Sequence, residues 1–146
     1  MRKIILAILL FPSICFADVY CVNQLQGNDA NFGKAVGSEC ASCLDTTVEP
    51  WQNLSIVNNT QFNNGDKVCF AGDSRWNESL ITQSGVSYES YGTGECPIID
   101  ANGIADQSVL IEGKSNVKLN NIHVVATRLN LIGKAIIVRN SNNINL

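Results

Sequence analysis

The sequence predicts an all-β fold of stacked coils, a β-solenoid, and two stretches near its end support this prediction. In each stretch apolar residues lie two apart, which is the spacing of side chains on one face of a strand. The second stretch repeats the first at one constant offset, and such a period indicates coils that pair with their neighbours. The repeated pairs are Val109 and Ile136, Ile111 and Val138, Val117 and Ile144, and Leu119 and Leu146.

Polar residues follow the same offset. We expect Glu112 and Arg139 to face outward as an opposite-charge pair on neighbouring coils, which stabilises by about 0.2–1 kcal/mol. Asn116 and Asn143 are expected at equivalent turns, where their side-chain amides could bond along the stack. The repeat therefore predicts a patterned surface as well as an aliphatic interior.

Residues 1–17 are typical of an export signal. Arg2 and Lys3 precede an apolar run over residues 4–11, which Pro12 ends. The run is shorter than the roughly 18–20 residues that a membrane span requires. A buried N-terminal helix is the alternative, but the charged start and the small residues near the end of the segment favour a signal. We therefore expect a secreted protein, extracellular or periplasmic, without a membrane span.

The cysteines agree with an oxidising compartment. An odd number remains once Cys15 leaves with the signal, so one thiol is free or has its partner outside this sequence. The Cys40-Ala-Ser-Cys43 spacing would also suit a redox or metal half-site. The sequence has no second close cysteine pair and a single histidine, so structural disulfides are favoured over zinc and no metal site is predicted. The disulfide candidates, whose connectivity stays open, are Cys21, Cys40, Cys43, Cys69 and Cys96.

Residues 18–62 are expected to form an N-terminal strand, a cysteine-bearing loop and a capping helix. The alternation over residues 18–25 predicts the strand, and the Gly-, Asn- and Asp-rich residues 27–31 predict a turn. Asp29 among asparagines could attract Ca²⁺, but one carboxylate is too few for a dedicated site and a plain turn is favoured.

The capping helix is predicted to begin near Pro50, whose missing N–H is not needed in a first helical turn. Trp51, Leu54 and Val57 fall three apart and would form its apolar stripe. Because the first coil of a solenoid otherwise exposes apolar side chains and strand edges, we expect this helix to cover it.

Residues 63–146 are expected to be the first coils of the solenoid. Turn residues separate short apolar stretches, and these predict strands at residues 67–70, 78–82, 86–90 and 97–100 before the repeated coils. The last stretch ends in mid-strand with no capping segment. We therefore expect the chain to be the opening part of a longer protein, truncated at its C-terminal end.

Several short motifs occur in order along nearly all of residues 18–146. They are Gly27-Asn28-Asp29-Ala30-Asn31, Pro50-Trp51 with Leu54, Asn64-Gly65-Asp66-Lys67-Val68-Cys69-Phe70, Gly72-Asp73 before Trp76, and Tyr91-Gly92-Thr93-Gly94-Glu95-Cys96-Pro97-Ile98-Ile99-Asp100. With these motifs the chain resembles the start of secreted right-handed parallel β-helix proteins of the pectate-lyase-like superfamily. The resemblance implies a right-handed parallel β-helix that opens with a strand and a short capping helix.

The resemblance also implies a polysaccharide lyase that cleaves an acidic, uronate-containing polymer. β-Elimination needs a base for the proton beside the carboxylate and a cation to neutralise that carboxylate. Lyases of this fold use Arg or Lys as the base and often Ca²⁺, so Ca²⁺ is possible for the complete protein, although no cofactor is expected in this chain. The implied groove lies on middle coils beyond Leu146, so no catalytic residue is assigned here and this chain alone is expected to be inactive.

Three outward side chains are groove candidates: Lys118 and His123 on predicted strands, and Arg128 in a loop. The alternative, which is favoured, is that they are solvated surface groups. Hydrolysis would require paired carboxylates. Asp100 and Asp106 are the nearest pair, but they flank a turn without evident geometry.

A non-catalytic β-helix that binds glycans or surfaces, such as an adhesin, remains the second hypothesis, since fold does not determine function. The formal net charge is only −3 and no basic patch or interleaved aromatic stripe occurs, so nucleic acid is not expected as a partner. The oligomeric state stays open.

Overall fold

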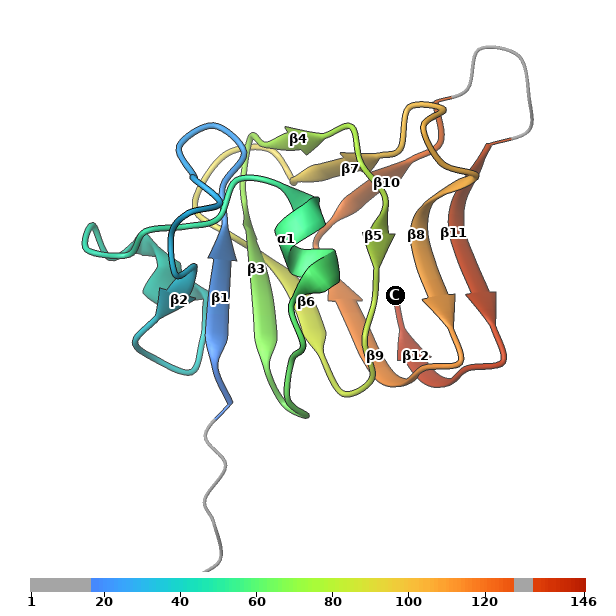
Figure 1. Cartoon of the computed structure of the whole chain (residues 1–146), viewed down its shortest axis with the longest axis horizontal. Coiled ribbons are helices and arrows are strands. Elements are labelled where there is room, and N and C mark those ends of the chain that lie inside the picture. The colour runs from blue at the N-terminus through green and yellow to red at the C-terminus, as the bar shows by residue number, and fades with distance from the viewer. Residues whose placement is uncertain (1–16, 128–132) are drawn as a thin grey trace, which may run out of the picture.

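The computed structural model describes residues 17–127 and 133–146, which form mostly β-structure with one short α-helix (Figure 1). The expected export signal, apart from residue 17, lies outside these residues. No helix in the described part of the chain is long and apolar enough to cross a membrane.

Three sheets form the sides of a β-solenoid whose coils follow one another along the longest axis of the molecule (Figure 1). Their strand orders are β12-β9-β6-β3-β1-β2, β10-β7-β4 and β11-β8-β5. Pairings between coils are parallel, whereas β2 pairs antiparallel with β1. The predicted all-β solenoid is therefore confirmed. The strands are β1 (Val19–Val22), β2 (Lys34–Ala35), β3 (Lys67–Ala71), β4 (Arg75–Trp76), β5 (Leu80–Ile81), β6 (Ser87–Tyr91), β7 (Ile98–Asp100), β8 (Gln107–Glu112), β9 (Ser115–Asn120), β10 (His123–Val125), β11 (Lys134–Arg139) and β12 (Asn142–Asn145).

The constant offset in the sequence is the register of the last two coils. Ile136 pairs with Val109 in the β8–β11 ladder, and Ile144 pairs with Val117 in the β9–β12 ladder. Leu146 follows the end of β12, so its expected pairing with Leu119 is not part of the ladder. Stacking of aliphatic side chains between these coils is thus as the sequence predicts.

The predicted polar contacts between these coils are also present. The Arg139 guanidinium donates to the Glu112 carboxylate at 3.0 Å, and the Asn143 amide donates to the side-chain oxygen of Asn116. Both asparagines adopt left-handed backbone angles, with φ of 56° at Asn116 and 50° at Asn143. Asparagine tolerates this conformation better than most residues, which explains its presence at the second position of β9 and of β12, where turns were expected.

The earlier coils also pair in parallel, but the number of residues from one coil to the next is not constant. Lys67 pairs with Ser87 in the next coil, and Ser87 pairs with Lys118 after a longer segment of chain. The turns between strands absorb the difference in length. A fixed period is therefore visible in the sequence only where two successive coils are equally long.

Large side chains fill the interior of the first coils. Phe70 contacts Trp76 edge-on at 5.3 Å between ring centroids, and it stacks on Tyr88 at 6.5 Å. The Tyr88 hydroxyl accepts a hydrogen bond from the Gln83 backbone N–H at 2.9 Å. Burial raises the pKa of Tyr88, so its hydroxyl stays protonated.

Helix α1 (Leu54–Asn59) begins later than predicted. Trp51 precedes it and forms a parallel bridge with Val22, although Trp51, Leu54 and Val57 are all buried as the apolar stripe predicts. The cause is Asp29, whose carboxylate accepts the Gln52 and Asn53 backbone N–H groups at 2.8 and 2.9 Å. These hydrogen bonds keep the backbone at Asn53 extended, so the helix cannot begin there. Asp29 thus orders the turn and the approach to the helix.

Hydrogen bonds with residues of the following coil hold helix α1 in place. The Glu78 carboxylate accepts the first helical N–H groups, at 3.3 Å from Leu54 and 2.9 Å from Ser55. Asn58 donates to the Ser79 carbonyl at 2.8 Å and accepts the Ile81 N–H at 2.9 Å, so it covers the edge of β5. Strand β5 is shorter than the expected strand at residues 78–82, and β4 has no counterpart among the predicted strands.

Candidate functional site

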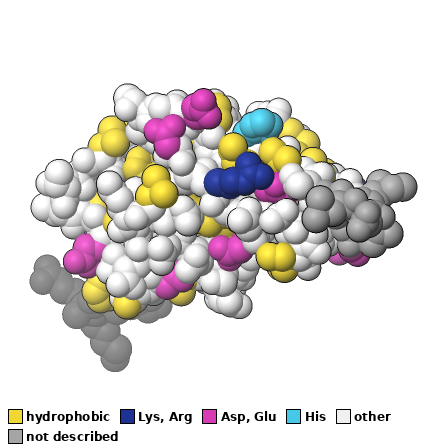
Figure 2. Space-filling model, turned by 90° about the horizontal axis from the view of Figure 1, so that it is seen from above, with side chains coloured by type: hydrophobic (Ala, Val, Ile, Leu, Met, Phe, Trp, Pro, Cys, Tyr) yellow, Lys and Arg dark blue, Asp and Glu magenta, His cyan; other side chains and the backbone are white. Residues whose placement is uncertain are grey.

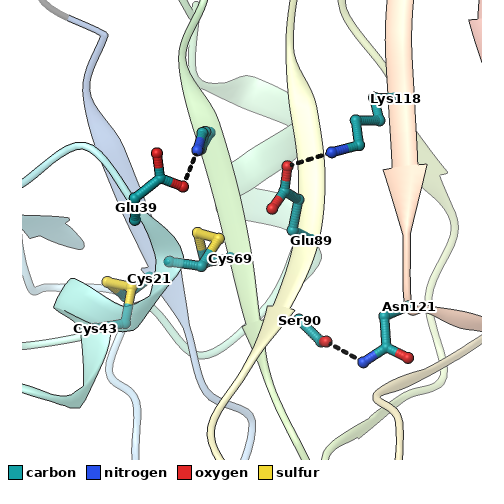
Figure 3. The surroundings of a disulfide bond; sticks show 10 residues. Cys21, Glu39, Cys43, Cys69, Glu89, Ser90, Lys118 and Asn121 are labelled. Atoms are coloured by element: carbon teal, nitrogen blue, oxygen red, sulfur yellow. Dashed lines mark hydrogen bonds and ion pairs between the residues drawn. A yellow bond between two sulfur atoms is a disulfide. The ribbon is translucent and has the colours of Figure 1, made fainter.

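Two disulfides fasten the cysteine-bearing loop to the outer face of the six-stranded sheet (Figure 3). Cys21 of β1 bonds to Cys43, and Cys69 of β3 bonds to Cys40, both loop residues lying in the 3-10 helix η1 (Cys40–Leu44). Cys40 and Cys43 therefore have different partners, and the alternative of a redox or metal half-site is wrong. Cys96 is exposed and free. The disulfides indicate an extracytoplasmic protein.

A second, smaller hydrophobic core lies beneath this loop. Side chains alternate along β1 and β3, so Val19 and the strand cysteines face away from the solenoid interior. The partly buried Tyr91, at the end of β6, packs against this core. The loop therefore covers the outer face of β1 and β3. The buried members are Val19, Cys21, Ala35, Cys40, Cys43 and Cys69.

Beyond the covered area, β6 and β9 carry polar groups on the same face (Figure 3). The Lys118 ammonium lies 3.1 Å from the Glu89 carboxylate, and 43% of the lysine side chain is exposed against 16% of the glutamate. Beside this pair, at the corner where β9 ends, Asn121 donates its side-chain amide to the Ser90 hydroxyl at 2.6 Å. This open polar surface is the candidate functional face, and Lys118 is held there by an opposite charge.

The three groove candidates do not come together. Lys118 is on β9 of the six-stranded sheet, whereas His123 is on β10 of a three-stranded sheet. Arg75 and His123 both pair with Ile98 of β7, one from each side. On the face seen in Figure 2, the histidine side chain (cyan) lies near a small group of Lys or Arg atoms (dark blue). Arg128 lies outside the described residues. The groove assignment therefore stays a prediction.

Asp100 is a fully buried carboxylate with several donors. It accepts the Arg75 guanidinium at 2.5 Å and the backbone N–H groups of Asn102 and Thr127 at 3.0 and 3.1 Å. Burial opposes its ionisation, but the hydrogen bonds from Thr127 and Asn102, together with the Arg75 charge, lower the pKa of Asp100. The ionised group fixes the turn after β7 and the chain after β10. Asp106 lies along that turn, where its backbone carbonyl accepts the Lys134 N–H.

The Arg75–Asp100 pair was not among the predicted functional residues. Its sequence signal is weak, because Arg75 and Asp100 belong to different coils, whose offset varies along the chain. The contacts of the Asp100 carboxylate indicate a structural role, because it accepts its hydrogen bonds from donors of the protein itself. Among residues 17–127 and 133–146, no group of three or more His, Cys, Asp or Glu side chains is placed to hold a metal ion.

No protein-family model matches the chain, and no curated protein matches its sequence. Similar solved structures include the native and the selenomethionine forms of a GH136 lacto-N-biosidase from Eubacterium ramulus. The likeness is one of fold. Each superposes with a TM-score of 0.60 at 21% sequence identity and covers 78% of this chain. The chain spans about a fifth of the length of these structures, 21% of each.

Proposed function

We propose that this chain forms the cap and first coils of an exported β-solenoid protein that acts on carbohydrate. The observation that supports it is the fold similarity to the GH136 lacto-N-biosidase over 78% of this chain. Because the chain spans 21% of that structure, the reaction itself is proposed for the whole protein. The contribution proposed for this chain is to start the stack, to protect its first edge and to present a glycan-binding surface.

For the whole protein we favour hydrolysis of a glycosidic bond over β-elimination. Elimination needs a base and a cation beside a uronate carboxylate. Lys118 is the candidate base on the open face, but there it is an ammonium that is paired with the Glu89 carboxylate at 3.1 Å. The Glu89 carboxylate would also repel an acidic sugar at that place. The glycosidase activity in the name of the similar structure supports hydrolysis.

A non-catalytic glycan-binding or surface-binding protein is the second candidate. Hydrolysis requires two carboxylates flanking the bond. Asp100 is instead engaged by Arg75 and by two backbone N–H groups. This engagement favours a structural role for Asp100 and would leave binding as the function of the chain itself.

The test uses the signal-processed chain in native gels that contain neutral or acidic polysaccharides. We expect at least one glycan to retard the chain relative to a gel without polysaccharide. No retardation by any glycan would refute the proposed role. The same preparation is incubated with chromogenic disaccharide glycosides and with polygalacturonate. We expect no product from the chain alone, and unsaturated uronate products would establish the lyase.

A further inference from the structure

A cleft of about 460 Å³ separates the end of the disulfide-bonded loop from the turns that follow β3 and β6. Its volume lies within the range of about 300–1,000 Å³ that is typical of small-molecule sites. Residues 44–46 line it from the loop, and residues 91–93 line it from the turn after β6. Ala71 and Gly72 also line it. The two turns are joined by a hydrogen bond from the Gly72 N–H to the Tyr91 carbonyl at 2.9 Å.

The loop wall of this cleft is preformed. The disulfide between Cys43 and Cys21 ties it to β1. The Asp45 carboxylate accepts the backbone N–H and the hydroxyl of Thr47 at 2.9 and 2.8 Å, which fixes the turn that follows. Because the wall is held by a covalent bond and by local hydrogen bonds, a ligand would not bear the entropic cost of ordering it.

The lining combines one aromatic ring with neutral polar groups. Tyr91 packs against the second core and also contributes to the cleft. Burial raises the pKa of Tyr91, in spite of its hydrogen bond with the Asn23 side chain, so the phenol is neutral. Gln26, Thr46 and Thr93 add exposed amide and hydroxyl groups. A tyrosine ring offers an apolar surface to a sugar ring, and amides and hydroxyls can donate to and accept from its hydroxyls.

Asp45 is the one charged residue among the described residues that line the cleft. The hydrogen bonds from the Thr47 backbone N–H and hydroxyl lower the pKa of Asp45, so the carboxylate is ionised at neutral pH. An acidic sugar would meet a like charge there, whereas a neutral sugar would meet a strong hydrogen-bond acceptor.

We infer that this cleft is a binding site for neutral sugar rings of an oligosaccharide. Tyr91 provides the stacking surface, Gln26 and Thr93 bind hydroxyl groups, and Asp45 disfavours uronates. The inference rests on the proposed function and narrows its ligand class to neutral glycans, in place of the acidic polysaccharide that the sequence resemblance implies.

Calorimetric titration of the signal-processed chain with a panel of neutral tetrasaccharides and with a galacturonate tetrasaccharide tests the site. Thr46→Trp fills the cleft from an exposed position and is expected to weaken neutral binding more than about tenfold. Gln26→Ala removes one hydrogen-bonding amide and should weaken it about three- to tenfold. Gln61→Ala is the matched control, because it removes an amide that is also exposed but lies outside the lining. Asp45→Asn keeps an acceptor for Thr47 and should strengthen galacturonate binding about threefold.

The outcomes separate this inference from the proposed function. If Thr46→Trp and Gln26→Ala melt at the parental temperature and still bind neutral glycans as the parent does, the cleft is not the binding site. The proposed function would then still stand. If the parent protein binds the galacturonate tetrasaccharide more tightly than the neutral ones, the inference that the ligands are neutral glycans is wrong. A parent that binds no glycan would overturn both.

Discussion

Removing the disulfide between Cys40 and Cys69 is expected to destabilise the chain by about 3–4 kcal/mol. The bond joins residues 29 apart in sequence. Closing a loop of that length lowers the entropy of the unfolded chain by an amount equivalent to about 3.6 kcal/mol at 25 °C. Cys40→Ala combined with Cys69→Ala removes the bond without leaving a thiol. The Cys21–Cys43 bond remains and holds the other end of η1, so the loop is weakened but not detached.

Urea unfolding followed by tryptophan fluorescence measures this loss. Trp51 precedes the capping helix and Trp76 lies in the next coil, and they are only 5% and 1% exposed, so both report exposure on unfolding. Cys96→Ala is the control, because that thiol is exposed and outside both disulfides, and it should change stability by less than about 0.5 kcal/mol. A double variant within about 1 kcal/mol of the parent, with Cys21–Cys43 shown to be intact, would refute the loop-closure argument.

Three further changes test the interior, the buried carboxylate and the surface pair. Leu80→Ala removes a fully buried side chain and should cost about 2–5 kcal/mol in urea unfolding, whereas Ile81→Ala, at the 46% exposed neighbour on the same strand, should cost less than about 1 kcal/mol. Asp100→Asn should lower the free energy of unfolding at pH 7 by about 2–3 kcal/mol. Because folding lowers the pKa of Asp100, its contribution is present above the unfolded value of about 4 and is lost as the pH falls through the folded value. The difference between parent and variant should therefore shrink on acidification, and a difference that is constant with pH would contradict this assignment. Lys118→Gln breaks an exposed pair with Glu89 and should cost less than about 1 kcal/mol and leave glycan retardation unchanged. Loss of retardation in that variant would instead place the glycan on the open face.

The solenoid could be predicted because two successive coils have equal length. Ile136 follows Val109 by the same offset as Ile144 follows Val117, and both pairs are ladder partners in the structure. Strand β4 could not be predicted in this way, because a strand made only of Arg75 and Trp76 carries no alternation. Its existence depends on pairing with β7 in the next coil.

The start of the helix and the disulfide pattern depend on contacts between distant residues. The sequence around Pro50 is compatible with a helical turn, but Asp29 captures the next N–H groups and delays the helix to Leu54. Cys21 and Cys69 are register partners on adjacent strands, yet each bonds to a loop cysteine. The spacing of cysteines in the sequence alone therefore does not predict which of them form disulfides. The cleft could not be predicted either, because its two sides lie next to each other only once the disulfides hold the loop against the sheet.

The first strand has a consequence for the order in which the chain can fold. Val19 of β1 pairs with Lys67 of β3, so the whole cysteine-bearing loop and helix α1 lie between the two partners, whereas later strands find theirs after much shorter segments. Bringing distant segments together costs more entropy and slows folding. A chain that emerges N-terminus first from an export channel could therefore pair β1 with the nearby β2 early, but the other edge of β1 would stay unpaired until β3 has followed. The first parallel pairing of the solenoid would thus form only after the loop and the helix have emerged.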